Sequence, residues 1–241
     1  MRIGAFAATD TGLVRSGNED SYYKGATVFA VADGLGGHQA GEVASAIAAQ
    51  AVAALDGQEL PDPAAAAAAL VAAARGANRS IMEQAVADEA RFGMGTTLTA
   101  AALVAGGRLQ LAHVGDSRAY LLRDGRLTQC TRDHTVVAEL VRHGRMTAEQ
   151  AAVHPERSVL TRAVGLDPGL EVDTPDPVEL AAGDQVLLCS DGLTETVADE
   201  RIAALLAAAD DGDGACRALV DAANAAGGPD NVTVVLLRVE R

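Results

Sequence analysis

The segment VFAVADGLGGHQAGEVAS, residues 28–45, passes from an apolar run into an alanine-rich stretch through a glycine-rich turn. Residues 28–32 are typical of a buried strand, and the stretch from Ala40 is typical of an amphipathic helix. A glycine-rich turn between a strand and a helix usually indicates phosphate binding. The dinucleotide motif would need a third glycine where Gln39 stands, and no Gly-Lys-Ser/Thr follows for a nucleotide P-loop. The turn after Asp33 therefore has another purpose.

Composition narrows the class of protein. The chain has 241 residues, of which 49% are hydrophobic and 22% charged, and this is enough apolar material for a globular core. The formal net charge of −14 argues against a surface for nucleic acid or for an anionic membrane, because both carry negative charge. We therefore expect neither as a partner. A cluster of carboxylates that binds cations would explain the same charge.

Cysteine usage and the N-terminus indicate a cytoplasmic protein. The three cysteines, Cys130, Cys189 and Cys216, are odd in number and widely spaced, as expected for reduced thiols. The first residues lack the basic segment and long apolar run of a signal peptide. The alanine-rich stretch 64–74 is too short to cross a membrane, and we interpret it as part of a soluble helix.

Apolar patterning predicts antiparallel sheets layered with helices in one domain that spans residues 1–241. The β-rich segment 95–130 contains Gly106-Gly107 and Asp124-Gly125, which are signals of two-residue hairpin turns. Residues 133–165 favour short helical pieces. No repeat or linker interrupts the chain. The other predicted strands are residues 3–8, 27–32, 185–192 and 232–239, and the predicted helices are residues 40–55, 64–88, 194–208 and 213–226.

Acidic residues recur at the ends of the apolar runs. Neighbouring strands would bring them together, and such carboxylates would raise one another's pKa values unless cations occupied the site. Oxygen ligands select hard ions such as Mg²⁺ or Mn²⁺. Ordinary turn chemistry explains any single Asp-Gly pair, but it does not explain the whole set. The acids are Asp33, Asp116 and Asp191 after apolar runs, Asp230 before the last run, and Glu19 and Asp20 in an early loop.

The glycines beside Asp33 have a place in this interpretation. They would let the backbone pass close to a metal held by Asp33, because glycine carries no side chain that would keep it away. The carbonyl oxygen of Gly34 is itself a candidate ligand.

Six short motifs occur in order along the chain. They are R-x-x-N-E-D from Arg15, D-G-L-G-G-H from Asp33, G-T-T from Gly95, H-V-G-D-S-R from His113, S-D-G from Ser190 and G-x-x-D-N ending at Asn231. Each motif is weak alone, whereas the ordered set is specific. The series resembles the metal-dependent Ser/Thr protein phosphatases of type 2C, the PPM family, and most closely its short bacterial members.

The resemblance implies a fold and a metal centre. The fold would be α+β, a four-layer sandwich of two central antiparallel β-sheets flanked by pairs of α-helices. Two Mg²⁺ or Mn²⁺ ions would bind tightly at one end of the sandwich, with Asp33 bridging them, and a third ion would bind more weakly. By the same resemblance, Asp191 and Asp230 would complete one tight site, Glu19 and the Gly34 carbonyl the other, and Asp116 with Asp191 would hold the third ion.

The implied reaction is hydrolysis of phosphoserine and phosphothreonine in proteins by a metal-activated water, which would reverse Ser/Thr kinase signalling. Two metal ions can lower the pKa of a water from about 15.7 toward 7, and the planar fork of Arg15 suits a phosphate. No cysteine is followed six positions later by arginine, so a thiolate mechanism is poorly supported. His38 is a candidate general acid, or else a histidine packed at a helix start.

The expected partners are phosphorylated proteins, including Ser/Thr kinases and their substrates, and the protein is expected to act as a monomer. The stretch from about 136 to 160, variable in the family, would form a flap beside the site. His113 is expected to be a hydrogen-bonded core residue, and His134, His143 and His154 to face solvent.

Two alternatives remain. One is a phosphatase specialised for a single phosphorylated regulator of a stress pathway. The other is a catalytically silent module that binds a partner, and the completeness of the acidic set disfavours it.

Overall fold

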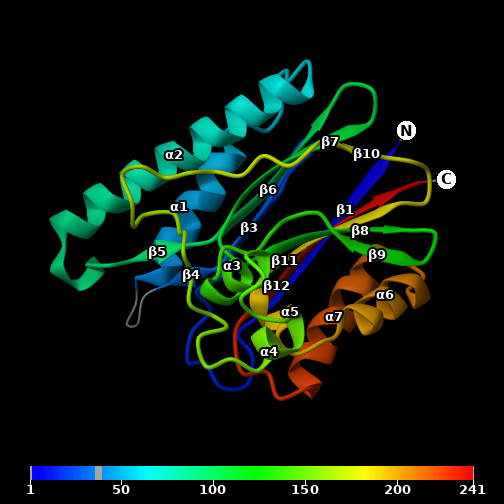
Figure 1. Ribbon diagram of the computed structural model, residues 1–241. Coiled ribbons are helices and arrows are strands. Elements are labelled where there is room, and N and C mark those ends of the chain that lie inside the picture. The colour runs from blue at the N-terminus through cyan, green and yellow to red at the C-terminus, as the bar shows by residue number, and fades with distance from the viewer. Residues whose placement is uncertain (1, 36–39, 241) are drawn as a thin grey trace.

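The computed structural model describes residues 2–35 and 40–240 (Figure 1). Two five-stranded antiparallel sheets form its centre, with strand orders β1-β12-β11-β8-β9 and β10-β7-β6-β3-β2. The first sheet contains β1 (Ile3–Asp10), β12 (Val232–Val239), β11 (Gln185–Cys189), β8 (Arg118–Arg123) and β9 (Arg126–Gln129). The second contains β10 (Val178–Glu179), β7 (Arg108–Val114), β6 (Leu98–Val104), β3 (Val28–Ala32) and β2 (Ser21–Lys24). A short pair, β4 (Gly34–Leu35) and β5 (Gly95–Thr96), follows β3.

Helices cover the outer face of each sheet (Figure 1). Helices α1 (Gly41–Ala53) and α2 (Pro63–Ala87) pack on the second sheet, and α6 (Asp199–Ala208) and α7 (Gly212–Ala225) pack on the first. The result is the expected four-layer sandwich with two antiparallel sheets inside and a helix pair on each side.

The alternation of side chains along the strands explains these layers. Successive residues of a strand point to opposite faces of the sheet. In β3, Val28 and Ala30 belong to the core beneath α1 and α2, whereas Phe29 and Val31 belong to the core between the sheets. In β11, Leu188 faces that same central core. Both faces of β3 are buried, so this strand is apolar throughout.

Helix α2 shows why the long alanine-rich segment is a helix. Asp62 caps it by accepting a 2.8 Å hydrogen bond from the backbone N–H of Ala65, Pro63 occupies the first turn, and alanine has the highest intrinsic helix propensity. Among the described residues, no helix has both the length and the apolar character that a membrane crossing requires.

Both predicted hairpins are present, but only the second has the predicted two-residue turn. The loop from β6 to β7 has three residues, Ala105, Gly106 and Gly107, and φ is 79° and 74° at its two glycines. Asp124 and Gly125 join β8 to β9 with φ of 50° and 78°. Positive φ at both central residues is the geometry that tight hairpins need.

Two predictions of local structure were wrong. The segment 194–208 is not one helix: α5 spans Asp191–Thr194 and a separate helix, α6, begins at Asp199. The backbone of Ala198 is extended, and two acidic residues open α6, where the helix dipole favours negative charge. The strand predicted over 185–192 ends at Cys189. Short helices were expected within 133–165, and the structure has α3 (Val136–Arg142) and α4 (Ala148–Ala152) there.

Candidate metal centre

The acidic residues gather at one end of the sandwich, where strands of both sheets end. Asp33 follows β3 of the second sheet, and Asp191 opens α5 just after β11 of the first. These two side chains are close enough to share a hydrogen bond. Asp116 lies in the turn from β7 to β8, which crosses from one sheet to the other. Asp230 lies two residues before β12 begins at Val232.

Burial and mutual repulsion make these acids hard to ionise. Burial raises the pKa of Asp33 well above its ordinary value, and the charges of Asp20, Asp191 and Asp116 raise that pKa further. Burial, followed by the charge of Asp116, does the same to the pKa of Asp191. Burial also raises the pKa of Asp116 to about 7. These acids can all be ionised at the same time only when a positive charge lies among them. The electrostatics of the cluster therefore suit a cation site.

Asp20 supplies a further observation of this kind. Its Oδ2 accepts a 2.7 Å hydrogen bond from Ser190 Oγ, whereas its Oδ1 is buried without a hydrogen-bond partner. Burial raises the pKa of Asp20 to about 6. Sequence reasoning counts Asp20 among the acids but does not assign it to a metal ion. Its buried, unpartnered oxygen agrees with its place in this acidic group.

Two threonines fix the backbone of Asp33. The Asp33 N–H donates to Thr97 Oγ1 at 2.9 Å, and the Asp33 carbonyl accepts from Thr96 Oγ1 at 2.9 Å. Thr97 Oγ1 in turn lies 2.7 Å from Ser117 Oγ. The G-T-T and G-D-S motifs therefore position Asp33, a role that sequence reasoning did not assign to them.

Asn231 organises the loop that carries Glu19. Its Oδ1 accepts from the Glu19 N–H at 2.8 Å, and its Nδ2 donates to the carbonyls of Thr11 and Gly17 at 2.8 and 2.9 Å. Sequence reasoning quoted Asn231 in a motif without a role. An Asn side chain offers one acceptor and two donors, and this loop uses all three.

Close backbone approach explains the glycines beside Asp33. A Cβ on Gly34 would lie 2.4 Å from the Gly41 carbonyl group and 2.6 Å from the Glu19 carbonyl oxygen. A Cβ on Gly41 would lie 2.0 Å from Glu19 Oε2. Real Cβ atoms do not approach other atoms so closely, so glycine at both positions lets Glu19 reach the turn after β3.

Arg15 lies at the edge of the same end of the sandwich. Its Nη2 donates to Asp230 Oδ2 at 2.6 Å, and its side chain is about half exposed. This bond is the largest of the influences that raise the pKa of Arg15. An exposed, always cationic group beside the carboxylates can meet an anionic substrate.

The carboxylates do not form a closed cluster by themselves. In the described part of the chain, no three His, Cys, Asp or Glu side chains are arranged so that they could hold a metal ion as they stand. The charges of Asp191 and Asp116 nevertheless raise the pKa of Asp33, and the charge of Asp116 raises that of Asp191. Carboxylate oxygens gather closely only around a bound ion, at about 2.1 Å from Mg²⁺. The donors are all oxygens and suit Mg²⁺ or Mn²⁺.

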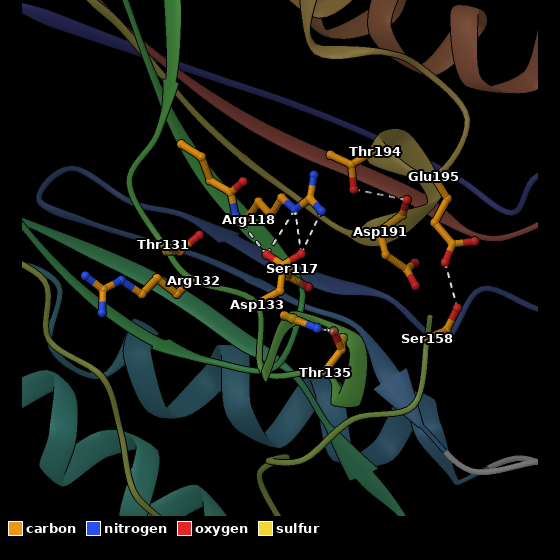
Figure 2. A network of polar contacts seen from close by, with 12 residues as sticks. Ser117, Arg118, Thr131, Arg132, Asp133, Thr135, Ser158, Asp191, Thr194 and Glu195 are labelled. Carbon is orange, nitrogen blue, oxygen red and sulfur yellow. Dashed lines mark hydrogen bonds and ion pairs between the residues drawn. The ribbon is translucent and has the colours of Figure 1, made fainter. Parts of the chain in front are cut away.

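A cavity of about 680 Å³ adjoins the centre. Its walls include Asp116 and Asp191 on one side and residues of α3 and α4 on the other. Figure 2 shows Asp191 at the start of α5 and Glu195 directly after its end, with Ser158 donating a 2.7 Å hydrogen bond to Glu195. The segment predicted as a flap thus borders the acids.

The histidines fall into three groups. His113 is buried and lies 2.9 Å from Thr99 Oγ1 and 3.0 Å from the Arg132 carbonyl, which confirms its prediction. His143 is exposed as expected, and His154 is half-buried. His134 was predicted to face solvent, and this prediction was wrong, because His134 is only 2% exposed. His38, the candidate general acid, lies outside the described residues.

A four-layer αββα sandwich with carboxylates at the shared end of its sheets is the architecture that the sequence resemblance implies for the metal-dependent phosphatases of type 2C. The chain matches the protein phosphatase 2C family over residues 15–225, and it belongs to that family. It is 50% identical over 234 residues to the serine/threonine protein phosphatase PstP of Mycobacterium tuberculosis, covering 97% of this chain and 44% of that protein. The chain thus spans less than half the length of that relative.

Another relative matches over most of its own length. The serine/threonine phosphatase stp of Listeria monocytogenes is 36% identical over 242 residues, which cover 95% of this chain and 93% of that protein. Among solved structures, Mycobacterium tuberculosis PstP/Ppp superposes with a TM-score of 0.92 at 47% identity over 99% of both chains. The catalytic domain of PstP in complex with two manganese ions gives a TM-score of 0.86 at 44% identity over 99% of both chains.

Proposed function

We propose that this chain is a Mg²⁺- or Mn²⁺-dependent phosphatase of phosphoserine and phosphothreonine in proteins. The observation that carries the proposal is the convergence of Asp33, Asp191 and Asp116 from both sheets, with pKa values raised by burial and by one another. Membership of the protein phosphatase 2C family and the manganese complex of PstP support it.

The chain's own residues would divide the work as follows. Bound metal ions would supply an activated water and neutralise charge on the phosphoryl oxygens. Arg15 would hold the substrate phosphate, and His38 would protonate the serine or threonine leaving group. Asp20 would hold Ser190, the residue before Asp191, through the hydrogen bond that it accepts from Ser190 Oγ. For the metal, Asp33 would bridge two ions, Asp191 and Asp230 would complete one site, Glu19 and the Gly34 carbonyl the other, and Asp116 with Asp191 would hold a weaker third.

The proposal extends to partners and organisation. The substrates would be phosphorylated proteins, including Ser/Thr kinases and their targets, and the enzyme would act as a cytoplasmic monomer. Residues 1–241 would form one catalytic domain, and residues 136–160 would be its flap.

A metal-replacement experiment tests the proposal. Chelation should reduce hydrolysis of a phosphothreonine peptide to background, and Mn²⁺ should restore it. Asp33→Asn should stay at least about 100-fold less active at any Mn²⁺ concentration, because it loses a carboxylate ligand, and calorimetry should show weaker Mn²⁺ binding. Asp124→Asn removes the same charge from the hairpin at the far end of β8 and should behave as the parent chain.

Two results would contradict the proposal. Full activity after exhaustive metal removal would reject the metal mechanism. Tight Mn²⁺ binding without hydrolysis of any peptide in a diverse phosphopeptide panel would favour the silent binding module, and hydrolysis of a single member would favour a specialised phosphatase.

A further inference from the structure

His134 is buried between β9 and α3, where the sequence predicts an exposed residue. Two hydrogen bonds join it to a single residue of the β7–β8 turn, Gly115. Its ring Nδ1 accepts from the Gly115 N–H at 3.0 Å, and its own backbone N–H donates to the Gly115 carbonyl at 2.8 Å. The side chain and the backbone of His134 therefore both bind Gly115, which directly precedes Asp116.

The backbone of Gly115 is also restricted by its conformation and its packing. Its φ of +107° lies in the region that favours glycine. A Cβ at Gly115 would lie 2.6 Å from Thr97 Cγ2, so the turn packs tightly against the threonine that positions Asp33. A shift of the Gly115 peptide would consequently move Asp116 relative to Asp33.

His134 also joins the two ends of the flap segment. Its carbonyl accepts from the Thr161 N–H at 2.8 Å, and the adjacent Thr135 pairs with Leu160. The chain leaves toward α3 and returns after α4 at this one point. The Asp116 turn and both ends of the flap therefore meet at a single buried residue.

The two ring nitrogens differ in the quality of their contacts. A backbone N–H only donates, so Nδ1 must be unprotonated to accept from Gly115, and the proton of the neutral ring lies on Nε2. Nε2 lies 3.2 Å from Asp173 Oδ2 but makes no hydrogen bond of good geometry. Asp173 is instead held by a 2.7 Å bond from Arg162. Burial lowers the pKa of His134, in agreement with a neutral ring.

We propose that His134 is a positioning residue, whose Nδ1 holds the Gly115 N–H and thereby fixes Gly115, and with it Asp116, relative to the other acids and the flap. The inference rests on the proposed role of Asp116 as a metal ligand. Loss of the Nδ1 acceptor should loosen the turn, raise the Mn²⁺ concentration needed for turnover, and leave the two tight ions in place.

Two isosteric substitutions separate the ring nitrogens. His134→Asn keeps an acceptor near Nδ1, and His134→Gln keeps only a polar group near Nε2. In metal-free protein, the Gly115 amide should exchange about tenfold faster in His134→Gln and in His134→Ala, as expected for one lost hydrogen bond, and His134→Asn should restore its protection. Turnover of a phosphothreonine peptide by the first two variants should require about tenfold more Mn²⁺, with rescue in His134→Asn. His143→Asn, at an exposed histidine, is the control.

Each outcome decides the proposal. Equal losses in His134→Asn and His134→Gln would overturn it, as would wild-type protection in His134→Ala. If the alanine variant does not fold, the nitrogen shifts of the wild-type ring still decide, because a protonated Nδ1 contradicts the proposed acceptor. If the wild-type protein lacks phosphatase activity with Mn²⁺, the proposed function fails. Exchange of the Gly115 amide still tests whether His134 Nδ1 holds Gly115.

Discussion

At the scale of single residues, the space beside Glu19 is as important as its carboxylate. Gly41→Ala should push Glu19 Oε2 away, because the new Cβ would lie 2.0 Å from that atom. The Glu19 side chain can rotate, but the new Cβ would also lie 3.0 Å from the Gly34 carbonyl carbon, so we expect about tenfold weaker Mn²⁺ binding by calorimetry and a small fall in melting temperature. Gly76→Ala, within α2 and with no atom within 4 Å of its Cβ, should instead stabilise the fold by about 0.5–1 kcal/mol. Unaltered Mn²⁺ affinity in Gly41→Ala would remove Glu19 from the ligand set.

The raised pKa values of the acids predict how the stability of the metal-free protein depends on pH. Burial raises the pKa of Asp116 to about 7 in the fold, against about 3.9 in an unfolded chain. The folded state therefore binds the proton more tightly, so this contribution is present below about pH 4 and is lost as the pH rises through about 7. The melting temperature without metal should fall over that range, and Asp116→Asn should flatten the curve. A curve as steep as that of Asp124→Asn would contradict this assignment.

Asp33, Asp116 and Asp191 were predictable from the sequence because each follows an apolar run, whereas the residues that support them were not. Thr97, Asn231 and Ser190 act through hydrogen bonds to residues distant in sequence, such as Asp33, Glu19 and Asp20. No local pattern marks which partner a polar side chain will find. His134 was misjudged for the same reason, since its burial depends on the β7–β8 turn.

At the scale of elements, apolar periodicity predicted the long units and failed for the short ones. Strand β3 and helix α2 carry many residues of one pattern. Strand β2 has only four residues, which alternate between half-buried and exposed, and only pairing with β3 fixes it. The two-residue β10 is likewise a product of its neighbour β7.

The flap segment is attached to the site by few polar contacts. Beyond the pairing near His134, Arg157 and Ser158 contact Glu195 at 3.4 and 2.7 Å. Replacing residues 144–156 by a short Gly/Ser linker should reduce hydrolysis of phosphopeptides about tenfold or more relative to p-nitrophenyl phosphate. The small ester is too short to contact α4, so it loses no binding energy when α4 is removed. The ratio of kcat/KM on the two substrates measures the effect. Parallel changes on both substrates would mean that the segment supports the acids and does not select substrates.

At the scale of the whole molecule, the site exists only where the two sheets meet. Asp33 follows a strand of one sheet, Asp191 follows a strand of the other, and Asp116 lies on the crossing between them. The packing between the sheets therefore sets the distances among the acids. Leu188 belongs to that central core and is buried completely.

Leu188→Ala should therefore affect both halves of the sandwich together. Loss of a buried leucine costs about 2–5 kcal/mol, and we expect one cooperative unfolding transition at lower denaturant concentration, with weaker Mn²⁺ binding. Hydrogen exchange should rise in parallel in α2 and α7, which lie on opposite faces, since neither sheet keeps its inner face covered alone. Val86→Ala, at a residue that is 87% exposed, is the matched control. Exchange that rises in α7 while α2 stays protected would show that the second sheet and its helices fold independently, and would reject the single-domain proposal.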